Sequence, residues 1–413
     1  MAAPVKRGTK VRVKELDGLR GIAIISVICV HYFSWVPLPR PRQGWLINLL
    51  LKPVDFVVLL PRSGGQGVTL FFVLSGFLIT TILLELRHQK YFFGVFYSRR
   101  AFRILPPYML GMFVYIVSSF ALGKPGSWGL WLRYIFYYSS LLPQLPRELT
   151  AVPPLLPIAV CGGLMPLWSL SVEELYYTFW APVIRYISEK GLIAIIAAML
   201  LSAPLLRYLL FVPLNGYAGY TFYCEMDGLA CGSGVALLLY ARRRNPDRWL
   251  PADGTFDRLC AISAVSAVLF NVLENYGAFS ARFFYTLNTS LTALCFAFVV
   301  YATLRKSGGD RLWLRSLRAP WLRSVGKVSY SLYLFHIALL DLVEGLLKRV
   351  RVEGHELLLL GHVFALLLSF GVAYGLWYAL ESPILRWKDR LVPSRSPNFE
   401  ELEKGKLKPP IRV

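Results

Sequence analysis

Residues 18–36 read Gly-Leu-Arg-Gly-Ile-Ala-Ile-Ile-Ser-Val-Ile-Cys-Val-His-Tyr-Phe-Ser-Trp-Val, an apolar run interrupted by one arginine and one histidine. A helical run of about 18–25 residues is long enough to cross a hydrocarbon core of roughly 30 Å. Similar runs follow at 66–86, 104–122, 166–187, 190–212, 222–241, 258–276, 284–304, 328–346 and 357–380. The sequence therefore predicts an all-α, polytopic integral membrane protein, a bundle of about ten transmembrane helices.

The composition excludes several soluble classes. Of the 413 residues, 56% are hydrophobic, 15% are aromatic and only 17% are charged, with a mean hydropathy of +0.51. That charged fraction is below the ~25% of soluble domains. It argues against a disordered chain, a coiled coil and a nucleic-acid-binding module, although the net charge is +21. The six cysteines form no pair or cluster with zinc-ligand spacing, so we expect no metal site.

Basic residues cluster in short loops, and this bias orients the helices. Five basic clusters face the cytoplasm only if the aromatic segment 128–143 does not cross the membrane, and the loop 347–356 then lies outside although it carries Lys348, Arg349 and Arg351. We therefore expect 128–143 to be re-entrant or interfacial, the loop 142–165 to lie outside and both termini to be cytoplasmic. The expected parts are a basic leader at 1–16, a membrane domain at 17–385 and a charged, disordered tail at 386–413.

Two titratable side chains interrupt the first run, and Asp17 precedes it. Such groups are costly inside a membrane and mark functional sites by default. Eleven helical steps from Arg20 to His31 make three turns plus about 20°, so both share a face, with His31 about 16 Å further along. We interpret His31 as a candidate base. The alternative is a histidine held by interhelical hydrogen bonds, with Asp17 and Arg20 as an ordinary interfacial ion pair.

Glu173 is a second titratable group, in the run Pro166-Leu-Trp-Ser-Leu-Ser-Val-Glu-Glu174. This helix is expected to enter from outside, which places Glu173 about 10 Å below the outer face. His31 lies at a similar expected depth, so the two side chains can meet as a base and its carboxylate partner. The alternative is a glutamate that only bonds to a neighbouring helix.

Arginines gather at the cytoplasmic end of the third run. Arg99 and Arg100 precede Arg103 by four and three residues, so the three side chains share a helix face. They form a guanidinium fork suited to phosphate. The alternative is a cluster that serves topology alone.

His336 and Asp341 match the His-x4-Asp signature of glycerolipid acyltransferases. Five helical steps separate the two side chains by about 140°, which argues against a dyad within one helix. The chain has neither a GxSxG elbow nor a complete dinucleotide fingerprint.

A series of motifs extends over nearly the whole chain: Glu15-Leu-Asp17-Gly-Leu-Arg20-Gly with His31, Leu70-Phe-Phe-Val-Leu-Ser75-Gly-Phe-Leu-Ile79, Tyr97-Ser-Arg99-Arg100-Ala-Phe-Arg103-Ile-Leu-Pro-Pro-Tyr108, Leu167-Trp168-Ser-Leu-Ser171-Val-Glu173-Glu174, Val328-Ser-Tyr330-Ser-Leu-Tyr333-Leu-Phe-His336 and Glu381-Ser-Pro383. In this order they resemble the acyltransferase-3 family of membrane acyltransferases. By this resemblance Arg20 and His31 match its Arg-x10-His motif, and Glu173 matches the glutamate of Trp-Ser-Leu-x-Val-Glu. Arg100 and Arg103 match Arg-x-x-Arg.

The resemblance implies transfer of a small acyl group, often acetyl, from cytoplasmic acyl-CoA to a sugar hydroxyl at a bacterial inner (plasma) membrane. It also implies supporting or substrate-binding roles for Asp17, Trp168, Ser171, Asp227, Tyr330 and His336. One position departs from the family, because Glu225 replaces the arginine of Arg-x-Asp-x-Leu-x-x-Gly.

We therefore expect a membrane O-acyltransferase in which Arg100 and Arg103, with Arg20, hold the coenzyme A phosphates. His31, oriented by Glu173, takes the proton of the acceptor hydroxyl, and a covalent acyl-histidine is the other route. The expected partners are acyl-CoA, a carbohydrate or glycolipid acceptor and the bilayer, without nucleic acid. The alternatives are a proton-coupled transporter using the same His and Glu, and a lipid acyltransferase using His336 and Asp341.

Overall fold

A computed structural model of the chain describes residues 13–33, 66–121, 128–141, 164, 166–214, 217–244, a few positions between 255 and 266, 281–350 and 355–392. Within these ranges it contains helices and turns and no strand, which confirms the all-α prediction. The main helices are α1 (Lys14–Phe33), α3 (Gln66–Leu86), α4 (Phe92–Ala121), α5 (Trp128–Ile135), α8 (Leu167–Tyr186), α9 (Glu189–Leu210), α10 (Phe222–Arg244), α12 (Ala281–Arg305), α13 (Leu312–Leu317), α14 (Pro320–Arg349), α15 (His355–Leu376) and α16 (Ser382–Leu391).

Among the described residues, seven helices are long and apolar enough to cross a membrane: α1, α3, α9, α10, α12, α14 and the continuous stretch of α15 and α16. This supports a polytopic membrane protein. Of the expected spans at 104–122 and 166–187, residues 104–121 are helical in α4 and residues 167–186 in α8. Both helices carry partly buried charged residues, such as Arg100 and Glu174. The expected span at 258–276 lies mostly outside the described residues, so the number ten stays a prediction.

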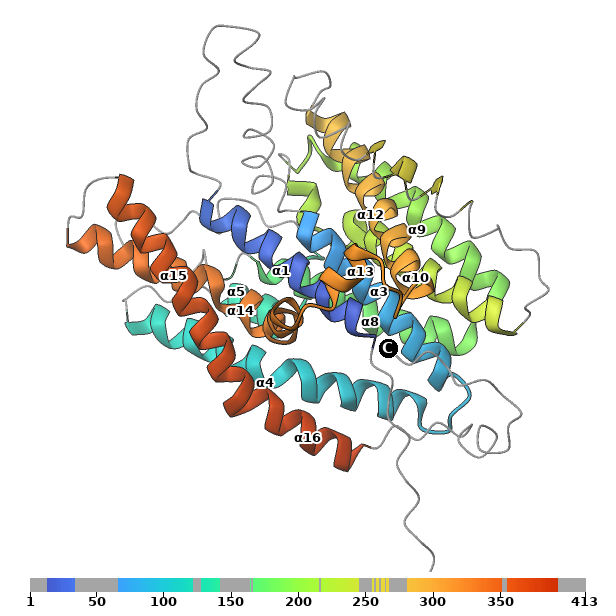
Figure 1. Ribbon diagram of the computed structural model, residues 1–413, viewed down its shortest axis with the longest axis horizontal. Coiled ribbons are helices and arrows are strands. Elements are labelled where there is room, and N and C mark those ends of the chain that lie inside the picture. Colours follow the sequence, from blue (N-terminus) through green and yellow to red (C-terminus); the bar gives the residue numbers. More distant parts are fainter. Residues whose placement is uncertain are drawn as a thin grey trace, which may run out of the picture.

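Helix α3 lies at the centre of the bundle, between α1 on one side and α10 on the other (Figure 1). Beyond α1 follow α14 and α15, and beyond α10 follow α9 and α12. Gly76 and Gly232 allow α3 and α10 to approach closely, because a Cβ at either position would collide with the backbone carbonyl of Leu229 or Val73. Small residues at such crossings are typical of membrane helices, whose association depends on close packing.

The outward faces of α9 and α15 are apolar. Leu201 and Leu205 on α9 are 75% and 57% exposed, and Leu367 and Phe364 on α15 are 65% and 59% exposed. A protein that exposes so many leucine and phenylalanine side chains would aggregate in water, whereas these side chains suit contact with lipid chains. These two helices therefore form part of the lipid-facing surface.

Helix α5 has eight residues, too few to cross a membrane. It buries Trp131 and Tyr134 against Tyr108 and Met112 of α4 and against Leu334 of α14. The described part of the segment 128–143 is thus a short helix followed by a turn, as expected for a piece that does not span. The outer loop predicted at 142–165 lies outside the described residues, apart from residue 164.

Helix α4 runs along the edge of the bundle and contacts α16 and the π-helical turn Trp377–Glu381 (Figure 1). Arg99 of α4 donates to Asp389 of α16 at 2.8 Å and to the carbonyl of Val392. The first residues of the predicted tail are therefore helical up to Leu391, because α16 is fixed against α4. Helix α1 likewise begins at Lys14, within the predicted leader.

Candidate active site

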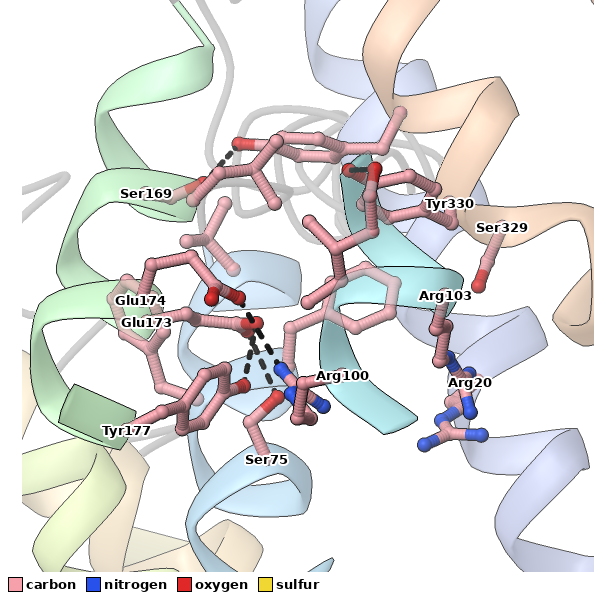
Figure 2. Close-up of a pocket in the computed structure, with 16 residues that line it drawn as sticks. Arg20, Ser75, Arg100, Arg103, Ser169, Glu173, Glu174, Tyr177, Ser329 and Tyr330 are labelled. Carbon is pink, nitrogen blue, oxygen red and sulfur yellow. Dashed lines mark hydrogen bonds and ion pairs between the residues drawn. The ribbon is translucent and has the colours of Figure 1, made fainter. Parts of the chain in front are cut away.

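Helices α1, α3, α4, α8 and α14 surround a pocket with an empty volume of about 740 Å³, its open mouth included. Its polar lining residues are Arg20, Ser75, Arg100, Arg103, Ser169, Glu173, Glu174, Tyr177, Ser329, Tyr330 and Tyr333. Five helices distant in sequence thus bring most of the predicted charged residues to one place (Figure 2).

Carboxylates line one wall of the pocket. Glu173 accepts hydrogen bonds from Ser75 of α3 at 2.8 Å and from Tyr177, one turn further along α8, at 2.7 Å. Glu174 forms an ion pair with Arg100 at 3.3 Å. The Arg100 guanidinium also lies over the Tyr177 ring, 3.9 Å from its centre. This wall is a connected network of two carboxylates, two hydroxyl groups and one cation.

Arg20 of α1 and Arg103 of α4 also line the pocket, on the side opposite the two glutamates in the view of Figure 2. Two guanidinium groups in one pocket lining form a local positive charge that favours an anion such as phosphate. Arg100 points into the same pocket, and its buried Nε has no hydrogen-bond partner among the described residues. An additional acceptor, which a phosphate or carboxylate oxygen provides, would satisfy that donor.

The predicted fork of Arg99, Arg100 and Arg103 is only partly present. Arg99 turns away from the pocket and bonds to α16, whereas Arg100 and Arg103 line the pocket. The difference arises because α16 places the acceptors Asp389 and Val392 beside Arg99. Arg20 joins Arg103 in place of Arg99.

His31 lies beyond the pocket, further along α1, and its partner is His336 of α14. Its Nδ1 is 3.0 Å from Nε2 of His336, and the ring centroids are 5.0 Å apart. The other nitrogen of His336, Nδ1, is 2.8 Å from the carbonyl oxygen of Tyr333, and the Tyr333 ring lines the pocket. Tyr333 therefore connects the histidine pair with the pocket lining.

The expected contact of His31 with Glu173 is wrong. Both oxygens of Glu173 are used by Ser75 and Tyr177, and Nδ1 of His31 contacts His336. The two residues were expected at a similar depth, but Glu173 lines the pocket and His31 lies beyond it. Helix α8 packs on α3 and α10, whereas α14 packs along α1 and brings His336 to His31. A His336–Asp341 dyad is not formed either, since both ring nitrogens of His336 have other partners.

Of the residues predicted to support the site, Tyr330 lines the pocket, whereas Asp17 and Trp168 are not part of the pocket lining. Tyr330 lines the pocket and donates to the carbonyl of Ile104 at 3.0 Å. Asp17 is buried at the beginning of α1, next to the crossing with α14. Trp168 packs edge-on against Phe72 and Tyr220, outside the pocket lining.

Ser171 and Asp227 are structural contacts. Ser171 Oγ is 2.8 Å from Ser140 Oγ, so it holds the turn after α5 against α8. Asp227 of α10 receives Arg207 of α9 at 3.0 Å on both carboxylate oxygens, in a site where neither side chain is exposed by more than 2%. Glu225, at the position of the family's arginine, also lies 3.7 Å from Arg207. The arginine beside Asp227 therefore comes from α9.

Sequence reasoning missed Ser75 and Tyr177 as partners of Glu173, and His336 as the partner of His31. Tyr177 follows Glu173 by four residues, so helical periodicity was a sufficient signal for it. The other two contacts join different helices, and no spacing along the chain reveals them. Within the described residues, no group of three or more His, Cys, Asp or Glu side chains suits a metal ion.

The pocket and the histidine pair lie within a helical bundle whose long apolar helices suit a membrane. A family model described as "Acyltransferase domain" matches residues 13–378. The chain belongs to this family, acyltransferase-3, as its motifs indicated.

Curated relatives resemble most of the chain. The peptidoglycan O-acetyltransferase OatA of Listeria monocytogenes is 24% identical over 363 residues, covering 81% of this chain and 50% of the relative. The putative peptidoglycan O-acetyltransferase YrhL of Bacillus subtilis is 26% identical, with 78% and 47% covered. A putative O-acetyltransferase of Staphylococcus aureus is 24% identical, with 79% and 50% covered. The chain thus spans about half the length of these relatives, and no solved structure matches it.

Proposed function

We propose that this protein is a membrane O-acyltransferase that moves a small acyl group, acetyl by preference, from cytoplasmic acyl-CoA to a hydroxyl group of a carbohydrate or glycoconjugate. Membership of the acyltransferase-3 family supports the reaction class. One structural observation favours this function most: Arg20 and His31 lie on the same helix, with the arginine in the pocket and the histidine beyond it.

The donor side of the proposal rests on Arg20, Arg100 and Arg103. Phosphate groups of the donor would bind between these three side chains, because guanidinium groups give strong, charge-assisted hydrogen bonds to phosphate oxygens. The thioester arm would then extend along α1, over the roughly 16 Å of helix rise that separates Arg20 from His31. Phe71 and Phe72 of α3 supply apolar lining for such an arm.

The chemical step assigned to His31 is proton abstraction. As the acceptor oxygen attacks the thioester carbonyl carbon, His31 takes the hydroxyl proton, a carbon–oxygen bond forms and the carbon–sulfur bond breaks. The protonated histidine then returns the proton to the departing thiolate. The products are an ester and a free thiol, and His31 is regenerated.

Glu173 and Glu174 have a different role in this proposal from the one expected. Glu174 neutralises Arg100 while the donor is absent, and the donor phosphate would take over that role. Glu173 keeps Ser75 and Tyr177 in fixed orientations at the pocket wall. Both carboxylates thereby shape the donor pocket, and neither contacts His31.

The acceptor is proposed from the relatives alone. Two of them are named as peptidoglycan O-acetyltransferases, one putatively, which makes a cell-wall glycan the first acceptor to test. Those relatives are about twice as long as the matched region, so the acceptor of this chain needs its own experiment. The bacterial inner membrane and cytoplasmic termini are part of the same proposal.

The test is release of coenzyme A thiol from acetyl-CoA by the purified full chain in detergent or lipid discs, with and without peptidoglycan fragments or other candidate sugars. Acceptor-dependent thiol release together with an acetyl ester on the sugar is the expected result. Proton movement across vesicles without either product would instead favour the transporter.

A further inference from the structure

The histidine pair has a hydrogen-bond order that the backbone fixes. His336 is fully buried, and its Nδ1 faces the carbonyl oxygen of Tyr333 at 2.8 Å. A carbonyl oxygen can only accept a hydrogen bond, so Nδ1 of His336 must be protonated. A neutral imidazole holds one proton, and its Nε2 is therefore an acceptor.

That acceptor determines the tautomer of His31. Nε2 of His336 lies 3.0 Å from Nδ1 of His31, so the His31 Nδ1 must be the donor in this bond. The His31 ring also donates to the backbone carbonyl of Val27, one turn earlier on α1. A neutral ring has a single N–H, so its Nδ1–H serves both acceptors, and Nε2 keeps its lone pair. A doubly protonated His336 would reverse this order, but burial of that charge without a hydrogen-bonded carboxylate is unfavourable.

The surroundings hold His336 in place. The Tyr32 hydroxyl donates to the backbone carbonyl of His336 at 2.7 Å and is 2.8 Å from Ser369 Oγ of α15. Helices α1, α14 and α15 are thus connected directly behind the histidine pair. Such a connection suits a group that must orient a catalytic ring.

We propose that His336 is a positioning residue that holds His31 in the Nδ1-protonated tautomer, so that Nε2 is the base for the acceptor hydroxyl. This inference rests on the proposed function, in which His31 takes the proton. When Nε2 receives the hydroxyl proton, the His31 ring becomes positively charged, and its Nδ1–H bond to His336 becomes stronger. The neutral Nε2 of His336 thereby stabilises the imidazolium until the proton passes to the leaving thiolate, the role in which a carboxylate was expected.

The tautomer can be measured without any activity. Nitrogen-15 spectra of the histidine-labelled parental protein, with the His31 signals assigned by their loss in the His31→Gln variant, distinguish a protonated Nδ1 from a protonated Nε2. A His31 signal with Nδ1 protonated near neutral pH is the expected result. A His31 protonated at Nε2 would overturn the inference, whether or not the proposed reaction is found.

The positioning role is then tested by kinetics. His336→Leu removes the acceptor, and we expect kcat to fall about 10- to 100-fold, the scale seen when the partner of a functional histidine is lost. Acyl-CoA binding should remain parental. His336→Gln keeps an acceptor oxygen near the place of Nε2 and should retain more activity than Leu. His362→Leu is the matched control, because His362 is equally buried but bonds to Leu358 and Glu344 and should leave kcat near the parental value.

A double-mutant cycle separates positioning from a general packing defect. If His336 acts only through His31, the residual activity of His31→Gln should not fall further when His336→Leu is added. Losses that multiply, or a parental kcat in His336→Leu, would overturn the positioning role. If His336→Leu does not fold, the same cycle is made with His336→Gln, and the nitrogen-15 spectrum of the parental protein decides the tautomer.

Discussion

Arg103 and Arg99 offer a matched pair for testing the donor pocket. Both are arginines on α4, four residues apart, but Arg103 lines the pocket with Arg20 and Arg99 bonds to α16. Replacing Arg103 by alanine removes a charged donor from the pocket. Hydrogen bonds to charged groups contribute about 1.5–3 kcal/mol. We therefore expect acyl-CoA binding to weaken by about 10- to 150-fold, at 1.4 kcal/mol for each factor of ten.

The Arg99→Ala variant should bind acyl-CoA nearly as the parent does, although the loss of its contacts with Asp389 and Val392 should loosen α16. Arg103→Lys should recover only part of the lost affinity, because an ammonium group cannot reproduce two parallel guanidinium hydrogen bonds. The assay is equilibrium titration of the purified variants with acetyl-CoA, after thermal unfolding has confirmed that each is folded. Equal weakening by Arg99→Ala and Arg103→Ala, or none by either, would refute the pocket as the donor site.

Three further predictions follow from individual contacts. Glu174→Gln should tighten acyl-CoA binding several-fold, since the ion pair of Glu174 with Arg100 competes with phosphate; weaker binding in the same titration would contradict this. Asp227→Asn should lower the thermal midpoint of the detergent-solubilised protein strongly, because removing one charge from a buried ion pair costs about 3–5 kcal/mol and leaves Arg207 with only the Glu225 carboxylate at 3.7 Å; an unchanged midpoint would show that the pair is dispensable. A cysteine at Ser307, in the exposed turn after α12, should react with an impermeant thiol reagent only after lysis; labelling in intact cells would reverse the predicted orientation.

Apolar runs were sufficient to predict where the long, membrane-length helices of the described residues lie, but not the short helices α13 and α16. The runs at 66–86, 190–212 and 222–241 correspond closely to α3, α9 and α10. The aromatic segment at 128–143 was correctly separated from the spans, because it is too short to cross and α5 has eight residues. Where a helix ends at the membrane surface was harder to predict, as α16 shows, because its amphipathic pattern resembles that of a solvated tail.

The pocket residues were predicted well and their partners poorly. Arg20, Arg100 and Arg103 were expected to act together and they line one pocket, whereas Glu173 was expected beside His31 and lines the arginine pocket instead. Contacts between helices depend on which helices pack together, and an amino-acid sequence without relatives gives no such pairing.

Two predictions about titratable residues, one for His31 and one for Asp227, show how much depends on which helices pack together. Depth alone suggested that His31 meets Glu173, whereas the packing of α14 along α1 brings His336 to it. The family resemblance gave Asp227 a supporting or substrate-binding role, and in the structure Asp227 forms a buried ion pair with Arg207 of α9.

The central claim is that His31 is the base of an acyl transfer. His31→Gln keeps polarity, approximate size and an amide that can donate to Nε2 of His336, but it cannot accept a proton usefully near neutral pH. A general base contributes roughly 10²–10⁴-fold in rate. The decisive measurement is acetyl transfer by purified His31→Gln protein, with acyl-CoA binding titrated on the same sample. Parental acyl-CoA binding with acetyl transfer reduced by at least that range is the expected result, and near-parental transfer would contradict the assignment of His31 as the base.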